Sequence, residues 1–345
     1  MAQNQQTNAK MVSLVVPVFN EEEALPAFLD AIRPGIHGVK QLLGPEGRVE
    51  IVFVDDGSHD GTASMIRQSK SPDFDVILVR LSRNFGKENA VSAGLKHARG
   101  QAVVPMDVDL QDPPELLPEM VRVWLQGRLV VNAKRSHRGS DSLIKRATSE
   151  WFYSIFNSMS DHAIEPNVGD FRLLDRKVVD IINSLTERVR FNKSIFSWVG
   201  FDPYTITYQR PARSAGSTKW NYWKLWNFAL DGLTGSTTLP LRMWTYVGSF
   251  LVLLMVLFAG FIILRALIWG IDVPGYASLM VVMLLVGAVN LVAIGVLGEY
   301  LGRISIEVRG RPSYLVSEHI MVGEVDPVQE IASTELDTST GRPPN

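Results

Sequence analysis

The sequence predicts an α/β protein, in which a mostly parallel sheet carries helices on both faces and a hydrophobic helix pair follows near the C-terminus. Two observations lead to this fold class. Short apolar runs alternate with helical segments over the first third of the chain, and nearly continuous apolar runs are typical of parallel strands buried on both faces. The 57 residues from Trp244 to Tyr300 contain only three charged residues, as membrane-spanning segments do.

Composition limits the chemistry that the chain can perform. It has 345 residues, of which 46% are hydrophobic, with a formal net charge of −2 and no cysteine. That length allows one large domain or two moderate ones. The absence of cysteine excludes disulfides, thiolate metal sites and cysteine nucleophiles. The near-neutral charge argues against a general polyanion-binding protein, and we expect no nucleic-acid partner.

The apolar runs that we expect to form strands are short and rich in β-branched residues. In chain order they span 13–18, 50–54, 76–79 and 102–106, with a further strand-like run at 129–133. Between them, three segments with helical patterns span 21–32, 62–68 and 87–98. Because ligands of such sheets bind beyond the carboxyl ends of the strands, the residues that follow each strand are the candidates for a functional site.

Carboxylates follow two of these strands. The run DDGS follows the second strand at 55–58, and DVDLQD follows the fourth at 107–112. Either run alone is an ordinary turn, helix cap or solvated loop, but together they place acidic groups at one edge of one sheet. In an extended segment Asp107 and Asp109 point the same way, and such paired oxygens suit Mg²⁺ or Mn²⁺ completed by substrate phosphates.

Two nucleotide-binding motifs are missing from the sequence. No P-loop sequence occurs, and no Gly-x-Gly-x-x-Gly run follows a strand. Their absence disfavours P-loop proteins and classical dinucleotide-binding proteins.

Five motifs in chain order carry a resemblance to a known family. They are VVPVFNE at 15–21, VDDGS at 54–58, SRNFGKE at 82–88, DVDLQDPPE at 107–115 and GDFRLLDR at 169–176. This series resembles the polyprenyl-phosphate glycosyltransferases of the GT-A (Rossmann-like) fold, inverting family 2. Within them it is most similar to the bactoprenol (undecaprenyl-phosphate) glucosyltransferases and the dolichol-phosphate mannose synthases. The resemblance covers residues 11–311 and includes the hydrophobic helix pair.

The resemblance implies a role for individual residues on the donor side. The nucleoside pocket would be lined by Pro17, Asn20, Glu21, Asp55 and Asp56. Asp107 would lie near the ribose and diphosphate, and Asp109 and Gln111 would coordinate a divalent cation, Mg²⁺ or Mn²⁺. Asp112 has two readings, a cap for a helix running from Pro113 or an active-site role.

The acceptor side requires positive charge, because a polyprenyl phosphate is an anion that must lie beside an anionic donor. The candidates are Arg135, Arg138, Arg210, Arg213, Ser217 and Lys219. The last four lie in a stretch that resembles the family's Arg-x-x-Gly-x-Ser-Lys loop, with Thr218 inserted. The alternative reading is surface or lipid-headgroup charge. The resemblance marks Asp170 as the catalytic residue, which orients or deprotonates the acceptor phosphate.

Two uncharged runs predict a membrane anchor. There are 22 residues between Arg242 and Arg265, and 26 between Asp272 and Glu299. At about 1.5 Å per residue each can cross a hydrocarbon core of roughly 30 Å. We expect spans at 244–267 and 275–299, the alternative being a buried helix pair in a soluble core. Basic residues precede the first span and follow the second, at Arg242, Arg303, Arg309 and Arg311, which predicts that both ends are cytoplasmic.

Aromatic segments next to the anchor predict contact with the membrane surface. Trp220, Trp223 and Trp226 recur at a helical spacing, and amphipathic aromatics favour the interface; a packed core stripe is the alternative. The segment 149–156 is a second candidate. Residues 1–10 are polar and lack the apolar core of a signal peptide. The expected divisions are a polar tail at 1–10, a catalytic domain at 11–202, a lipid-phosphate loop and interfacial helix at 203–243, the spans at 244–300, a juxtamembrane segment at 301–325 and a disordered tail at 326–345.

The predicted activity is inverting transfer of a hexose, with glucose from UDP-glucose favoured, to undecaprenyl phosphate. We expect it on the cytoplasmic face of a bacterial inner membrane, with membrane lipids as partners and a homo-oligomer as the assembly. A GDP-mannose or amino-arabinose nucleotide donor is the alternative. A processive polysaccharide synthase is disfavoured because no Gln-x-x-Arg-Trp sequence occurs. A noncatalytic membrane scaffold is disfavoured by the presence of Asp107, Asp109 and Gln111.

Overall fold

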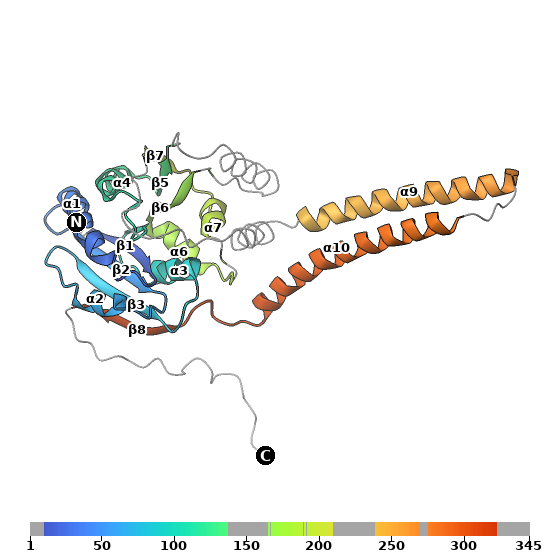
Figure 1. Cartoon of the computed structure of the whole chain (residues 1–345). Coiled ribbons are helices and arrows are strands. Elements are labelled where there is room, and N and C mark those ends of the chain that lie inside the picture. Colours follow the sequence, from blue (N-terminus) through green and yellow to red (C-terminus); the bar gives the residue numbers. More distant parts are fainter. Residues whose placement is uncertain are drawn as a thin grey trace, which may run out of the picture.

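The computed structural model describes residues 10–136, 165, 167–188, 190, 192–209, 239–269 and 275–322. Both predicted interfacial helices lie outside these residues, and so do both predicted tails except for residue 10. Figure 1 shows an α/β domain and two long helices that extend from it side by side, α9 (Leu239–Trp269) and α10 (Tyr276–Val308).

Within the described residues, eight strands form one sheet in the order β7-β5-β6-β4-β1-β2-β3-β8. Their bounds are β1 Met11–Val18, β2 Arg48–Asp55, β3 Asp75–Leu81, β4 Ala102–Pro105, β5 Val130–Arg135, β6 Val168–Asp175, β7 Tyr204–Tyr208 and β8 Val316–Met321. The central strands β4, β1, β2 and β3 run parallel, and so do β5 and β7. β6 pairs antiparallel with β4 and β5, and β8 pairs antiparallel with β3. The predicted mostly parallel sheet is confirmed, with antiparallel strands added to it.

Helices cover both faces of the sheet, as predicted. They are α1 Leu25–Leu43, α2 Thr62–Gln68, α3 Lys87–His97, α4 Leu117–Leu125, α6 Arg176–Ser184 and α7 Asn192–Trp198. Strand residues alternate between two apolar clusters: Leu14 and Phe53 pack with α1 and α4, whereas Val15 and Val54 pack with α3, α6 and α7. The central parallel strands β1, β2, β3 and β4 are therefore buried on both faces of the sheet.

Helix α1 differs from its prediction at both ends. It was expected at 21–32, but Glu21 accepts backbone hydrogen bonds from Ala24 and Leu25, so a turn precedes the helix. The helix then continues through Pro34 to Leu43. A proline removes one backbone hydrogen bond, and the turns beyond it are retained because they bury apolar side chains, among them Ile36 and Val39.

Helix α9 extends beyond the predicted span 244–267 at both ends. Helix α10 begins one residue after the predicted start of 275–299 and continues past its predicted end to Val308. Their large apolar side chains are exposed, including Phe250, Leu257 and Leu291. Within the described residues one segment, Leu285–Val308, is long and apolar enough to cross a membrane, with 24 residues and a mean hydropathy of 1.7. The two-span anchor stays a prediction.

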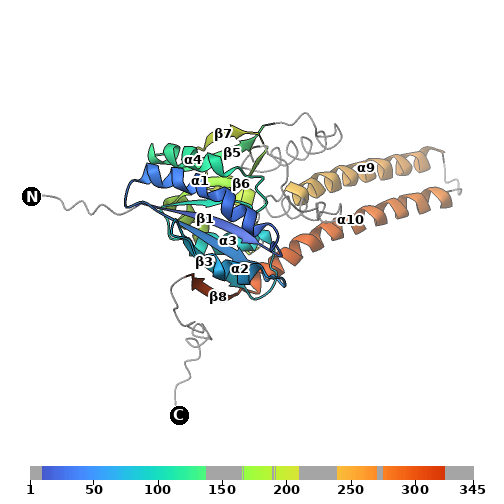
Figure 2. The ribbon, with the colours of Figure 1, turned by 60° about the vertical axis from the view of Figure 1, so that its left-hand side comes forward.

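The chain returns from α10 to the domain through β8, which forms the edge of the sheet beside β3 (Figure 2). Arg67 donates two hydrogen bonds to Glu318, from Nε at 3.1 Å and Nη2 at 2.6 Å. At the end of α10, the amide of Arg188 donates to Glu307 Oε1 at 2.8 Å. Residues predicted as a juxtamembrane segment at 301–325 thus include a strand of the catalytic sheet.

Glu318→Gln is expected to destabilise the fold by about 1 kcal/mol or less at neutral pH, because Arg67 loses a charged partner. The hydrogen bonds from Arg67 lower the pKa of Glu318. The stabilisation is therefore complete at neutral pH and is lost as the pH falls through that lowered pKa. Thermal unfolding of wild type and variant in detergent, at neutral and acidic pH, measures the difference. The exposed Glu115→Gln is the control; a difference for Glu318→Gln that does not shrink in acid would contradict the assignment.

Candidate active site

The turn after β1 is tied to the turn after β2. Asn20 has a left-handed backbone with φ of 54°. Its amide donates to Ser58 Oγ at 2.9 Å, and its side-chain Oδ1 accepts from the amide of His59 at 2.9 Å. The amide of Glu21 donates to Thr62 Oγ1 at 2.9 Å. Of the residues predicted to hold the nucleoside, Asn20 and Glu21 are therefore fixed beside the second strand, and Pro17 lies in β1 just before them.

Asp55 and Asp56 are both buried at the end of β2. Asp55 Oδ1 accepts from the amide of Ser58 at 2.8 Å, and its Oδ2 lies 3.1 Å from Arg80 Nε. Asp56 accepts from the amides of Phe85 at 2.7 Å and Gly86 at 2.9 Å. Burial raises the pKa of Asp56, and these two amide donors partly offset that rise. Both carboxylates shape the loops after β2 and β3, and their contact with a nucleoside stays a prediction.

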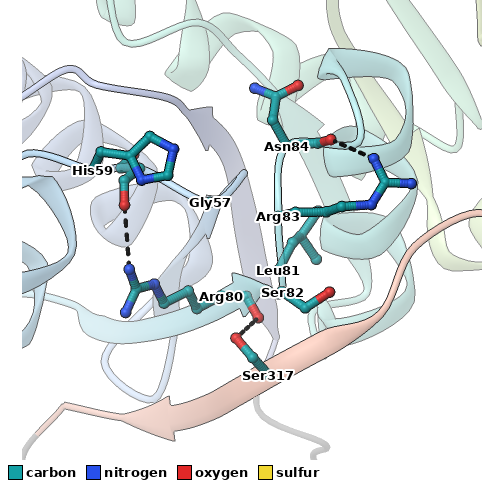
Figure 3. Close-up of a pocket in the computed structure, with 9 residues that line it drawn as sticks. Gly57, His59, Arg80, Leu81, Ser82, Arg83, Asn84 and Ser317 are labelled. Carbon is teal, nitrogen blue, oxygen red and sulfur yellow. Dashed lines mark hydrogen bonds between the residues drawn. The ribbon is translucent and has the colours of Figure 1, made fainter.

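A pocket of about 330 Å³ opens beyond the carboxyl ends of β2 and β3 (Figure 3). It is lined by Gly57, Ser58, His59, Arg80, Leu81, Ser82, Arg83, Asn84 and Ser317. Gly57 has a φ of +74°, and a Cβ there would lie 2.6 Å from the carbonyl carbon of Arg83, so the site requires glycine. Ser317 comes from β8 and donates to the carbonyl oxygen of Arg80 at 3.1 Å. None of the predicted nucleoside residues lines this pocket, although Asn20 and Asp55 contact residues that do.

The acidic loop after β4 is turned, so the condition under which Asp107 and Asp109 would point the same way, an extended segment, is not met. Leu110 has a left-handed φ of 57°, and Asp109 Oδ1 accepts from the amide of Gln111 at 3.2 Å. Asp107 points instead to Lys87, with 2.6 Å between its Oδ1 and the ammonium Nζ. Gln111 is buried, whereas Asp109 is partly exposed.

Asp112 does not cap a helix. The short 3₁₀ helix that follows, Pro114–Leu116, has no side-chain cap. Asp112 is 2% exposed and accepts from the hydroxyl of Tyr208 at 3.2 Å. Burial, and then repulsion by Asp107, raise the pKa of Asp112 to about 6. The helix cap is therefore not observed, and an active-site role for Asp112 stays a prediction.

Arg135 is the described member of the predicted acceptor-phosphate set. Its Nε donates to Tyr208 Oη at 3.2 Å, and its Nη2 lies 3.7 Å from Asp112 Oδ1. A Cβ on Gly169 would lie 3.0 Å from that Nη2, so the glycine makes room for the guanidinium. The other predicted residues, Arg138, Arg210, Arg213, Ser217 and Lys219, lie outside the described residues.

Asp170 on β6 lies close to Asp107, although the two are far apart in sequence. Lys87 Nζ bridges them, at 3.2 Å from Asp170 Oδ2. The other carboxylate oxygen, Oδ1, is buried and has no hydrogen-bond partner in the part of the chain that the structure describes. Burial would raise the pKa of Asp170, but Lys87, Lys193 and Arg172 together lower it below its usual value. Asp170 is therefore ionised at neutral pH.

Several members of this cluster escaped prediction. Lys87 and Glu88 lie in the motif at 82–88, so the sequence identified the segment but assigned no role to either residue. Arg172 lies in the motif at 169–176; its Nη2 donates to the carbonyl of Gly169 at 2.7 Å, and its guanidinium lies 4.3 Å from the ring centre of Phe196. Tyr208 and Lys193 lie in no motif, because their contribution depends on where β7 and α7 are placed.

The oxygen ligands available at the acidic loop suit a hard divalent cation. Asp109 supplies a carboxylate and Gln111 an amide, both oxygen donors. Within the described residues, no group of three or more Asp, Glu or His side chains is arranged to hold a metal ion. Mg²⁺ is commonly held by one or two carboxylates and completed by water and substrate phosphates, so the two donors suit a cation that arrives with a diphosphate.

Asp109→Asn is expected to weaken Mn²⁺ binding in the presence of a nucleoside diphosphate by about 10-fold or more, because a charged ligand becomes neutral. Electron paramagnetic resonance of free Mn²⁺ measures the affinity directly. Asp202→Asn is the matched control, since that carboxylate is 89% exposed and belongs to a surface ion pair. Equal affinities for Asp109→Asn and wild type would remove Asp109 from the metal site.

Comparison with known proteins gives consistent matches. The profile described as Glycosyl transferase family 2 matches residues 13–182. The chain is 50% identical over 307 residues to the SfII prophage-derived bactoprenol glucosyl transferase of Shigella flexneri, covering 89% of this chain and 97% of that protein. It is 48% identical over 305 residues to the prophage bactoprenol glucosyl transferase homolog of Escherichia coli strain K12, covering 88% and 98%.

A solved structure also aligns with the chain. Glucosyl-3-phosphoglycerate synthase from Mycobacterium tuberculosis, in complex with Mn²⁺, UDP and phosphoglyceric acid, aligns at a TM-score of 0.43 with 18% identity. The alignment covers 65% of this chain and 76% of that one. No site residue is assigned from so distant a match.

Proposed function

Because this chain belongs to glycosyl transferase family 2, we propose that it transfers glucose from UDP-glucose to undecaprenyl phosphate at a membrane surface. The observation that carries the proposal is the 50% identity, over 97% of its length, to a protein named bactoprenol glucosyl transferase. The chain is a glycosyltransferase, and bactoprenol phosphate is its acceptor. UDP-glucose as the donor rests on the motif resemblance and on the carboxylate edge that suits a nucleotide diphosphate.

On the donor side, the chain has to hold a diphosphate that gains one negative charge when its bond to the anomeric carbon breaks. Asp109 and Gln111 would hold Mg²⁺ or Mn²⁺, and that cation would neutralise charge on the leaving diphosphate. Asp107 lies in the same loop after β4 and is held by Lys87. The nucleoside would lie at the ends of β1 and β2, where Asn20 and Glu21 are fixed by hydrogen bonds.

On the acceptor side, a phosphate oxygen attacks the anomeric carbon as the bond from that carbon to the diphosphate breaks. The bonding electrons leave with UDP, so no further reactant is needed. A phosphate monoester has a second pKa of about 6, and its oxygen is nucleophilic without a strong base. Asp170 suits an orienting role, because its buried Oδ1 can accept a hydrogen bond from a phosphate that retains a proton.

The long apolar helices suit a lipid acceptor. Leu285–Val308 is long and apolar enough to cross a membrane, and α10 connects directly to β8 of the catalytic sheet. This connection would keep the carboxyl edge of the sheet near the lipid headgroups. Two spans, a bacterial inner membrane, a cytoplasmic catalytic domain and a homo-oligomer belong to the same proposal.

A donor panel tests the function. Membranes containing the chain are incubated with undecaprenyl phosphate, Mg²⁺ or Mn²⁺, and radiolabelled UDP-glucose, GDP-mannose or an amino-arabinose nucleotide. We expect UDP-glucose to give a lipid-soluble product that carries a single sugar, and membranes without the chain to give none. Preference for another nucleotide would replace the donor, a labelled polymer would indicate a processive synthase, and no lipid product from any donor would refute the proposal.

A further inference from the structure

Lys87 lies at the centre of the carboxylate cluster, and no role for it follows from the predicted donor or acceptor sets. It is the first residue of α3. Its ammonium is 2.6 Å from Asp107 Oδ1 and 3.2 Å from Asp170 Oδ2. Asp107 belongs to the proposed donor side and Asp170 to the proposed acceptor side. The Lys87 ammonium thus pairs with one carboxylate from the proposed donor side and one from the proposed acceptor side.

The position of Lys87 is set by the backbone that precedes it. Gly86 has a φ of +93°, which favours glycine. Its amide and that of Phe85 both donate to the buried carboxylate of Asp56. The end of β2 therefore fixes where α3 begins, and with it the origin of the Lys87 side chain.

Lys87 compensates the negative charges of Asp107 and Asp170, and other charged groups surround the same cluster. Glu88 faces the same cluster: its Oε2 accepts from the amide of Asn192 at 2.8 Å, and burial, followed by repulsion from Asp170, raises its pKa to about 7. Lys193 on α7 and Arg172 on β6 also face Asp170. Within the part of the chain that the structure describes, neither forms an ion pair with Asp107, whereas Lys87 contacts both carboxylates. Loss of Lys87 would leave Asp107 and Asp170 to repel each other across the site.

We propose that Lys87 is a positioning residue for glycosyl transfer, which fixes Asp107 and Asp170 in one arrangement. This inference rests on the proposed function. Lys87 acts through the two carboxylates, so it affects the step in which donor and acceptor are aligned more than it affects donor binding.

The test compares Lys87→Met, which keeps the length without the charge, with Lys87→Arg and wild type. We expect Lys87→Met to lower kcat about 10- to 100-fold, with a much smaller change in KM for UDP-glucose, and Lys87→Arg to recover a large part of the activity. Lys96→Met is the matched control, because Lys96 is exposed on the same helix; it should keep wild-type activity. Wild-type kcat in Lys87→Met would overturn the proposal.

A double-mutant cycle separates this role from a structural one. Because both variants disrupt one unit, Asp170→Asn combined with Lys87→Met should cost less than the sum of the two single effects, and additive effects would count against the coupling.

Three further outcomes are distinguishable. If thermal unfolding shows that Lys87→Met is not folded, Lys87→Gln replaces it. Wild-type kcat in Lys87→Gln would overturn the proposal equally. If the wild-type chain forms no glucosyl lipid, the proposed function itself fails. If the wild type is active and the variants match it, only the role of Lys87 fails.

Discussion

The site depends on compensation of carboxylates that gather at the carboxyl edge of one sheet. An uncompensated buried charge costs several kcal/mol, so each group here has a partner. Asp56 accepts from two backbone amides, Asp112 accepts from a tyrosine hydroxyl, and Asp107 and Asp170 share the ammonium of Lys87. These contacts cross from one strand end to the next. They hold the loops after β2, β3 and β4 in one arrangement, so the site is preorganised before a ligand binds.

The same sheet also connects the chemistry to the long helices. β8 follows α10 and pairs with β3, and Ser317 from β8 lines the pocket beside Arg80. The pocket wall and the end of α10 are therefore parts of one continuous segment, tied down further by the hydrogen bonds from Arg67 to Glu318. For an enzyme whose acceptor is a lipid phosphate, such a connection would hold the reacting groups at a constant height above the bilayer.

Local patterns predicted the parallel core well and its antiparallel additions poorly. Helix α2 has the predicted bounds, 62–68, whereas α1, predicted at 21–32, spans Leu25–Leu43 because apolar packing retains the turns beyond Pro34. β6 and β8 escaped prediction because they carry charged residues, including Asp170 and Glu318, that break an apolar run. The motifs identified Asp107 and Asp170 separately. Their bridge through Lys87 could not be predicted, because it depends on β6 lying next to β4 in the sheet.

The proposed glucosyl transfer is a single displacement, in which Asp170 stays an ionised, orienting carboxylate and never bonds to the sugar. The anomeric configuration of the lipid product tests this most directly. The glucose of UDP-glucose is α-linked, so one in-line attack by the acceptor phosphate inverts the centre. Proton NMR of the purified glucosyl lipid should show a β-linked glucosyl phosphate. An α-linked product would indicate two displacements through a covalent intermediate and would contradict the role given to Asp170 and the site around it.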